Sequence, residues 1–348
     1  MTENSVAFDA AGSLKQAKVK PSNTVGKRDA RIFQIWRLVS ALTSDGVRFW
    51  KYSFTKWTND REHYRAEMAM DLHFIEYGMS LRNPRYGYGK NKIARLLDDL
   101  EHYVANWGAD EQTEIAAKTL QAYVAFNRHG GLDMDALEAR VRPILALQDT
   151  GMLSGAEFVT RDEIQSVGKM DFLAFARARH SIRQYSPEPV DPEAIRRAVA
   201  VAQQSPSSCN RQTCRVHVYT DKASVQKVLE LQSGNRGFGD QLGGVCIVWT
   251  DERNWTEAAE RAFGLVDGGM FLMSLAYGFH AEGLGAITLN WAEEPAHDKV
   301  LRRLTGLPDS AKIVSLLGFG SLPEDLRVPI SHRRPIDTCM TLNAPLSN

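Results

Sequence analysis

The amino-acid sequence predicts two structural parts, an all-helical N-terminal region and a C-terminal region in which helices and strands alternate. Apolar residues recur at helical spacing between about residues 32 and 127. After Asp171, helical stretches alternate with short apolar runs that have the length of strands. The chain is also longer than one typical domain, with 348 residues. We therefore expect two folded regions.

Composition excludes several classes of protein. The 42 basic and 42 acidic side chains cancel, so no overall field favours nucleic acid or an anionic membrane. The four cysteines show no C-x-x-C spacing, which fits a reducing compartment and predicts no metal site. Pairing of Cys209 with Cys214, through a metal or a disulfide, is the weaker interpretation. We expect a cytoplasmic protein.

Neither a secretory signal nor an integral membrane segment is expected. Asp9 interrupts the only early apolar run, and no signal-like core follows a basic start. The longest apolar stretch, residues 263–284, contains Asp267, His280 and Glu282. Ionisable groups at these positions favour a buried central helix over a membrane span.

The N-terminal half is predicted to be a disordered segment, residues 1–28, followed by a helical domain, residues 29–165. The first segment lacks apolar periodicity and contains helix-breaking residues. Within the helical domain, the apolar stripe from Ile32 to Leu42 is expected to pack against its own domain. A membrane surface or a partner groove is the alternative.

A Gly- and Arg-rich segment, residues 78–89, separates two of the predicted helices. Its arginines and tyrosines, with the preceding His73 and Glu76, could line a pocket. A surface turn that caps the two helices explains the same composition. The sequence leaves both interpretations open.

Residues 166–340 are predicted to form the second folded domain, with a short tail at 341–348. The expected order is helix 192–204, strand 215–220, helix 222–232, strand 244–250, helix 257–281, strand 285–290, helix 293–304 and strand 311–319. Taken alone, this simple alternation favours a parallel, doubly wound sheet.

Two short segments of this domain have the residue types of a cofactor site. In Arg179-His180-Ser181-Ile182-Arg183, two guanidinium groups and a hydroxyl alternate after a predicted helix at 171–178, where they can converge on a phosphate. An exposed basic turn at a helix end is the alternative. Further on, Pro206-Ser207-Ser208-Cys209-Asn210-Arg211-Gln212 offers a tight loop with two side-chain amides, which suit a flat, hydrogen-bonding heterocycle.

With three further elements, these segments resemble the FMN-dependent nitroreductase family. The further elements are Gly283-Leu284-Gly285 after the long apolar helix, Gly318-Phe319-Gly320 after a strand, and His332-Arg333-Arg334-Pro335 near the C-terminus. The resemblance covers residues 171 to about 340. It implies an α+β fold with a mixed sheet surrounded by helices, in a homodimer whose chains interlock, and we prefer this topology to the parallel sheet.

The resemblance also implies roles for individual residues. Arg179 and Ser181 are expected near the FMN phosphate with His180 beside them, and Arg183 near N1 and O2 of the flavin ring. A cation at that place would stabilise the negative charge of reduced flavin. The remaining expected cofactor contacts are Pro206, Ser207, Ser208, Asn210, Gln212, Gly283, Leu284, Gly285, Arg333 and Arg334. In the family both cofactor sites lie at the dimer interface, so one chain completes neither.

This chain departs from the family pattern after Gln212. Thr213 and Cys214 stand where family members usually have proline and an aromatic residue. The departure leaves the expected ring contacts in place, but it changes the local packing and with it the preference for a substrate.

The expected function is an NAD(P)H oxidoreductase that uses FMN to reduce a small electrophile by ping-pong hydride transfer. Candidate acceptors are a nitroaromatic, a quinone or an activated alkene, and no catalytic side chain is expected beyond the flavin. Dehalogenation, azoline oxidation and flavin fragmentation also occur on this fold. The alternative of a different class is a flavin-binding structural or regulatory protein, linked by its N-terminal extension to polysaccharide biosynthesis. P-loop, zincin and esterase motifs are absent from the sequence.

Overall fold

The computed structural model describes residues 27–53, 59–81, 83–157, 159–167, 170–329, 331 and 333–346. The chain divides into two compact units, Met1–Gly46 and Val47–Asn348. The segment 1–28, predicted to be disordered, lies almost wholly outside the described residues. The predicted domain boundary near residue 165 stays a prediction, because both of its sides lie in the second unit.

Helix α1, Lys27–Tyr52, begins in the first unit and ends in the second. Within the first unit the helix does not bury its apolar stripe. Exposed fractions lie between 55% and 66% for Ile32, Ile35, Trp36, Val39 and Leu42. At its other end, Arg48 forms an ion pair with Asp298 at 3.0 Å, inside the second unit.

Four helices of the second unit enclose a hydrophobic core of their own: α2 (Arg61–Ser80), α3 (Lys90–Trp107), α4 (Glu111–His129) and α5 (Asp135–Leu145). The predicted stripe of α3 is buried, including Leu96 and Leu100. Helix α4 begins at a capping box, in which Asp110 accepts from the Thr113 amide while Thr113 Oγ1 accepts from the Asp110 amide.

The Gly- and Arg-rich segment between α2 and α3 is tied to the neighbouring helices. The Tyr88 hydroxyl donates to the Ile75 carbonyl, Tyr123 donates to the Tyr88 carbonyl at 2.6 Å, and the Gly87 amide donates to Asn127 at 2.6 Å. These contacts fit the surface-turn interpretation. Arg82 lies outside the described residues.

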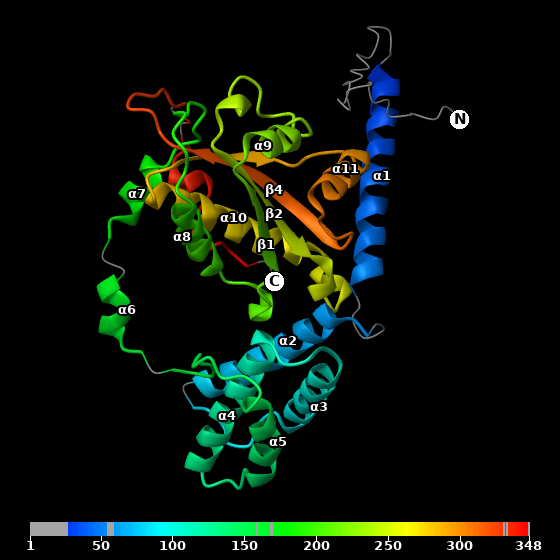
Figure 1. The fold of residues 1–348 in the computed structure, drawn as a ribbon, viewed down its shortest axis with the longest axis vertical. Coiled ribbons are helices and arrows are strands. Elements are labelled where there is room, and N and C mark those ends of the chain that lie inside the picture. Colours follow the sequence, from blue (N-terminus) through cyan, green and yellow to red (C-terminus); the bar gives the residue numbers. More distant parts are fainter. Residues whose placement is uncertain are drawn as a thin grey trace. The chain divides into compact units, whose positions relative to one another are not determined.

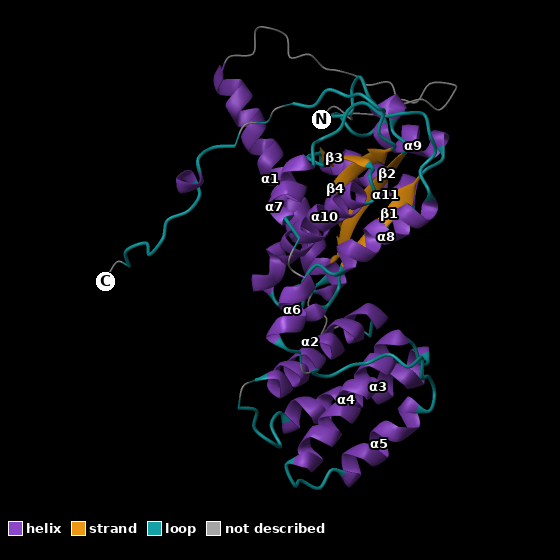
Figure 2. Ribbon diagram, turned by 90° about the vertical axis from the view of Figure 1, so that its left-hand side faces the viewer, coloured by secondary structure: helices purple, strands orange, loops and turns teal. Residues whose placement is uncertain are grey.

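A connection that contains α6 (Arg161–Val167) leads to the sheet-containing part, which Figures 1 and 2 show. Its helices are α7 (Phe172–Ala178), α8 (Pro192–Gln203), α9 (Lys222–Leu229), α10 (Phe263–Ala281) and α11 (Pro295–Thr305). Its strands are β1 (Cys214–Tyr219), β2 (Gly244–Asp251), β3 (Gly285–Asn290) and β4 (Ala311–Gly320). Each predicted strand boundary is met within one residue.

The sheet has the order β1-β2-β4-β3, and all its strand pairs are antiparallel. A single parallel bridge joins Ser181 to Ala286 at the edge, and this bridge supplies the mixed character of the predicted sheet. The predicted α+β class is therefore confirmed. The parallel sheet that alternation alone would favour is wrong. Helices α9 and α11 each join neighbouring strands that run in opposite directions, and β2 and β3, the parallel strands that α10 joins, are separated by β4.

Helix α10 lies on the sheet and α8 packs against α10 (Figure 1). A methyl group on Gly278 would come within 2.7 Å of the Ala198 backbone, so glycine permits this close approach of the two helices. The stretch predicted as a helix from residue 257 begins as a 3₁₀ helix, Ala258–Ala262, before α10.

Among the described residues, one helical stretch, Ala258–Ala281, is long and apolar enough to cross a membrane. This stretch consists of the 3₁₀ helix Ala258–Ala262 followed by α10. The buried Phe271, Leu275 and Phe279 belong to the core between α8 and the sheet, which is the place of a central core helix.

Candidate functional site

The first predicted cofactor segment runs along the edge of the sheet. After α7, Ser181 forms its parallel bridge with Ala286, and the Ile182 amide donates to the Ala286 carbonyl at 3.1 Å. The pairing holds residues 181–182 extended and places them beside the start of β3. The segments 179–183 and 283–285, about 100 residues apart in sequence, are therefore neighbours in the fold.

The turn between α10 and β3 explains two of the predicted glycines. Gly283 ends the helix with φ of 72°, a left-handed conformation that favours glycine. A methyl group on Gly285 would lie 2.8 Å from Leu322 and 3.0 Å from Ile182. Glycine at 285 thus allows the first cofactor segment to approach the strand closely.

A cavity of about 210 Å³ opens beside these two segments. Its lining includes Arg179, His180, His280 and Leu284. Burial lowers the pKa of the His280 imidazole below its ordinary value, so this ring is neutral at pH 7. Arg183 is exposed, and its guanidinium lies 3.5 Å from the Ser181 carbonyl.

The second predicted segment, residues 206–212, is a strained loop. Cys209, Asn210 and Gln212 have φ of 53°, 50° and 50°, left-handed values that are uncommon for residues other than glycine. Three such residues within four positions mark a loop whose conformation is imposed by its surroundings, as at many ligand sites. Asn210 and Gln212 are exposed.

Asp267 of α10 is one of the groups that impose this conformation. Its side chain is buried, and it accepts hydrogen bonds from the Ser208 amide at 3.0 Å and from the Ser208 hydroxyl at 3.1 Å. Within the loop, the Gln212 amide donates to the Ser207 hydroxyl at 2.9 Å. Sequence reasoning used Asp267 only as an argument against a membrane span.

Arg211 is the second residue that holds the loop, and no sequence pattern pointed to its role. It lies between the two exposed amides, yet its side chain is only 1% exposed. It pairs with Glu260 at 2.6 Å and donates to the Asn254 carbonyl at 3.0 Å. Burial would raise the pKa of the Glu260 carboxyl, but the bond from Arg211 and nearby backbone amides outweigh it and lower this pKa.

A cavity of about 470 Å³ lies in front of this loop, within the size range of about 300 to 1,000 Å³ typical of cofactor sites. Both the loop and the helices α2 and α4 line it. The contributions of the helical part are Glu62, Arg65, Glu111, Gln112 and Ile115. No sequence signal indicated that the extension would reach this cavity.

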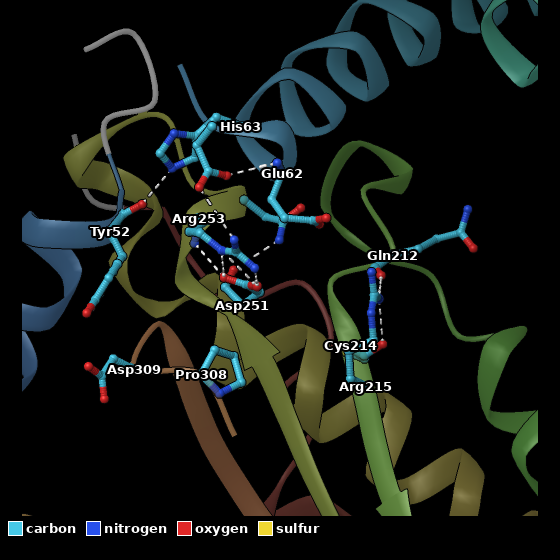
Figure 3. A network of polar contacts seen from close by, with 12 residues as sticks. Tyr52, Glu62, His63, Gln212, Cys214, Arg215, Asp251, Arg253, Pro308 and Asp309 are labelled. Atoms are coloured by element: carbon cyan, nitrogen blue, oxygen red, sulfur yellow. Dashed lines mark hydrogen bonds and ion pairs between the residues drawn. The ribbon is translucent and has the colours of Figure 1, made fainter. Parts of the chain in front are cut away.

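Side chains of β1 complete the wall next to the loop. Arg215 donates to the carbonyls of Gln212 and Cys214, which Figure 3 shows together with the nearby polar network around Arg253. Burial raises the pKa of the Cys214 thiol to about 12, so this cysteine is protonated at neutral pH and is a poor nucleophile.

The two cavities lie at different places along α10. Phe271 lines the larger cavity, and Ala276 and His280, five and nine residues further along the helix, line the smaller one. At 1.5 Å per residue these two residues lie about 8 and 14 Å from Phe271 along the helix axis. The structure thus brings the first cofactor segment to the Gly283 turn, but it leaves the 206–212 loop at a separate cavity.

The C-terminal arginines do not join either cavity lining. Arg333 and Arg334 are exposed, and Arg333 donates to the nearby Ser331 carbonyl. Figure 2 shows this part of the chain running away from the sheet towards the C-terminus. His332 lies outside the described residues. The phosphate role expected of Arg333 and Arg334 stays a prediction.

The donor set of the two segments suits a flavin. The described residues contain no group of three or more His, Cys, Asp or Glu side chains that could hold a metal. All four cysteines are free. Two outward amides on a fixed loop can hydrogen-bond to a ring edge, and Arg179 with His180 can hold a phosphate.

Comparison with known proteins confirms the resemblance for part of the chain. Residues 176–235 match the sequence model of the nitroreductase family, and this stretch contains both predicted cofactor segments of the first half of the domain. No curated protein gives a match.

Several solved structures resemble the chain. An FMN-dependent nitroreductase from Clostridium difficile R20291 is 18% identical, with a TM-score of 0.42, over 49% of this chain and 99% of its own. A nitroreductase candidate from Desulfovibrio desulfuricans, solved in complex with FMN, is 22% identical, with a TM-score of 0.44, over 51% of this chain and 99% of its own. A nitroreductase family protein from Clostridium difficile 630 is 19% identical, with a TM-score of 0.44, over 51% of this chain and all of its own.

Proposed function

We propose that the protein is an FMN-dependent oxidoreductase that takes electrons from NAD(P)H and reduces a small electrophilic molecule. The observation that carries the proposal is the preformed 206–212 loop at a cavity of about 470 Å³, inside a stretch that matches the nitroreductase family. When bound, FMN supplies hydride uptake from the donor and hydride delivery to the acceptor, so no further catalytic side chain is required.

The residues of the chain hold and tune this cofactor. Asn210 and Gln212 present amides to the edge of the ring, and the fixed backbone of their loop sets the angle at which they do so. Arg179, His180 and Ser181 hold the phosphate, and Arg183 provides a positive charge near the ring. Helices α2 and α4 contribute Glu62, Arg65 and Glu111 to one wall of the cavity. These charged groups make the cavity polar, which favours acceptors with hydrogen-bonding groups.

We propose a homodimer, because one chain has its phosphate-holding segment and its amide-bearing loop at separate cavities. A second copy could bring the complementary segment to each cavity. Exposed apolar side chains on α10, among them Val266 and Met273, offer a surface for such a copy, because exposed apolar patches often mark interfaces.

The remaining proposals concern location and partners. Four free thiols fit a reducing cytoplasm, and the balanced charge of the chain gives no reason to expect nucleic acid. We propose a small molecule as the acceptor and retain both NADH and NADPH as donors.

Turnover separates this proposal from a purely structural or regulatory flavoprotein. The purified protein is given NADPH or NADH with menadione or nitrofurazone, and consumption of the nicotinamide is followed at 340 nm. We expect acceptor-dependent turnover with ping-pong kinetics. A protein that binds FMN but shows no turnover with either donor would support the regulatory alternative.

A further inference from the structure

The buried side chain of Arg211 has no role in the chemistry proposed above, yet it has the densest set of contacts in the loop. Two exposed amides flank it in the sequence, and its guanidinium points the opposite way, into the protein. The backbone makes this possible: Asn210 and Gln212 are left-handed, whereas Arg211 is right-handed with φ of −69°. Because the sign of φ changes from Asn210 to Arg211 and again to Gln212, the Arg211 side chain lies on the opposite side of the loop from the two amides.

The partners of Arg211 come from two separate parts of the fold. On one side are Glu260 at 2.6 Å and the Asn254 carbonyl at 3.0 Å, with the Trp255 ring 5.3 Å from the guanidinium carbon. On the other side is Met70 of α2, whose sulfur lies 2.9 Å from Arg211 Nη2. The guanidinium therefore connects the loop to the helical extension.

The energetics favour a fixed rather than an optional contact. A buried guanidinium without its carboxylate partner is costly, so Arg211 and Glu260 hold each other in place. Because the side chain is anchored, the backbone at 211 cannot turn without breaking the ion pair. The left-handed conformations of the neighbouring residues, which are unfavourable by themselves, are held by the same anchor.

We infer that Arg211 is a positioning residue, which fixes the Asn210 and Gln212 amides in the orientation required for the ring, and that Met70 of the extension supports it. This inference rests on the proposed function for its purpose, but its physical content is a statement about loop order. The helical extension is then a structural part of the cofactor site.

Cys209 provides a probe of loop order that requires no bound cofactor. It is half-buried in the loop, with φ of 53°. The rate of its alkylation by iodoacetamide, measured peptide by peptide with mass spectrometry, reports how often the loop opens. Loss of a charge-assisted anchor should raise this rate by about tenfold or more in Arg211→Met. Arg211→Lys, which keeps the charge, should recover part of the protection.

Matched variants separate the positioning role from general destabilisation. Met70→Ala should raise the Cys209 rate about two- to fivefold, since it removes one weak contact of the anchor. Met68→Ala, two residues away in the core of the extension and 0% exposed, should lower the melting temperature more but leave the Cys209 rate unchanged. Arg302→Met, which breaks a remote buried pair with Asp298, is the control for loss of an ion pair.

Flavin binding gives the second readout. Arg211→Met should weaken FMN affinity by about tenfold while the Arg302→Met control keeps it. An unchanged Cys209 rate in Arg211→Met, or equal rates in Met70→Ala and Met68→Ala, overturns the inference. If Arg211→Met does not fold, the comparison of Cys209 alkylation rates between Met70→Ala and Met68→Ala tests the inference. If the protein binds no FMN at all, the proposed function fails, whereas the alkylation rates still test the positioning role.

Discussion

The two segments predicted to hold the cofactor differ in how the chain supports them. The 206–212 loop is held from behind by buried charged groups, Asp267 and Arg211, and presents its amides outward. The 179–183 segment is attached to the sheet edge through the backbone of Ser181 and Ile182 and through the buried Ile182 side chain, and Arg183 is exposed. The loop is thus preorganised by its own chain.

This difference indicates where the binding free energy of a flavin would come from. A preorganised loop loses little conformational entropy when a ligand binds, whereas flexible arginine side chains must be ordered at that moment. We therefore expect changes behind the loop to act mainly through the shape of the site. Changes in the 179–183 segment should act through charge.

The largest effect is expected from Asp267→Ala, which removes the buried carboxylate that holds the 206–212 loop. The change leaves the Ser208 amide and hydroxyl without their acceptor, at a cost of about 1 to 3 kcal/mol. We expect FMN affinity to fall by about 10- to 100-fold in a fluorescence titration. Asp267→Asn keeps one acceptor oxygen, so its FMN affinity should lie between those of the unchanged protein and Asp267→Ala. Unchanged affinity in Asp267→Ala would mean that the loop holds its shape without this carboxylate.

Asp99 of α3 offers the opposite case, because it is a half-buried carboxylate. Its Oδ2 has no hydrogen-bond partner among the described residues, and burial, with Glu67 nearby, raises the pKa of this carboxyl to about 6. Because the folded pKa exceeds the unfolded value of about 3.9, its contribution to stability is full below pH 4 and is lost as pH rises through 6.

Asp99→Asn should therefore stabilise the protein at pH 7.5 and have little effect at pH 4. After allowance for partial solvent screening, we expect about 1 to 2 kcal/mol in the free energy of unfolding at pH 7.5. Urea unfolding at the two pH values measures it, with Asp325→Asn, an exposed aspartate of the C-terminal part, as the control. Equal effects at both pH values would show that the carboxyl is not destabilising when ionised.

A smaller effect, of a different kind, is expected in the exposed segment. Arg183→Ala removes a positive charge that we propose lies near N1 and O2 of the flavin ring, where reduced flavin becomes negative. It should lower the flavin potential by about 30 mV, or roughly 1.4 kcal/mol for a two-electron couple. Arg334→Ala, expected near the phosphate, should weaken binding and leave the potential nearly unchanged. Potentiometric titration distinguishes the two variants. A flavin potential that changes only in Arg334→Ala would mean that Arg334, and not Arg183, lies near the ring.

The smallest effect concerns the wall supplied by the extension. Arg65 lines the larger cavity while its Nη1 pairs with Asp110 at 3.0 Å. Arg65→Gln should raise the KM for 4-nitrobenzoate about two- to threefold and leave that for nitrobenzene unchanged, since a half-exposed charge contributes little. Arg61→Gln removes another partner of Asp110 that lies outside the cavity lining, and should affect neither substrate.

Periodicity in the sequence predicted the secondary structure well but not the direction of the strands. The strand predicted at 244–250 is observed as Gly244–Asp251. It could be predicted because every residue of this strand is buried, and a fully buried strand gives a nearly continuous apolar run in the sequence. Alternation of helices and strands nevertheless favours parallel pairing, and only the resemblance led to the observed α+β fold. Strand direction depends on how each connection crosses the sheet, and local periodicity does not encode it.

The candidate site was predictable only where residue types themselves carry the chemistry. Asn210 and Gln212 were predicted as ring contacts because two amides near a tight turn suit a heterocycle. The structure places both in the lining of a cavity, and their contact with a ring stays a prediction. Arg211 and Asp267 were missed as supports, since their partners lie 49 and 59 residues away. The contribution of α2 and α4 to the cavity is a tertiary contact with no local signal.

Cofactor uptake by the purified protein tests the central claim most directly. Protein stripped of any ligand is titrated with FMN and, in parallel, with FAD, and the bound flavin is followed by fluorescence and by gel filtration with light scattering. We predict a yellow protein that binds one FMN per chain, prefers FMN to FAD, and carries the flavin in a dimer. A colourless protein that takes up neither flavin would contradict the account.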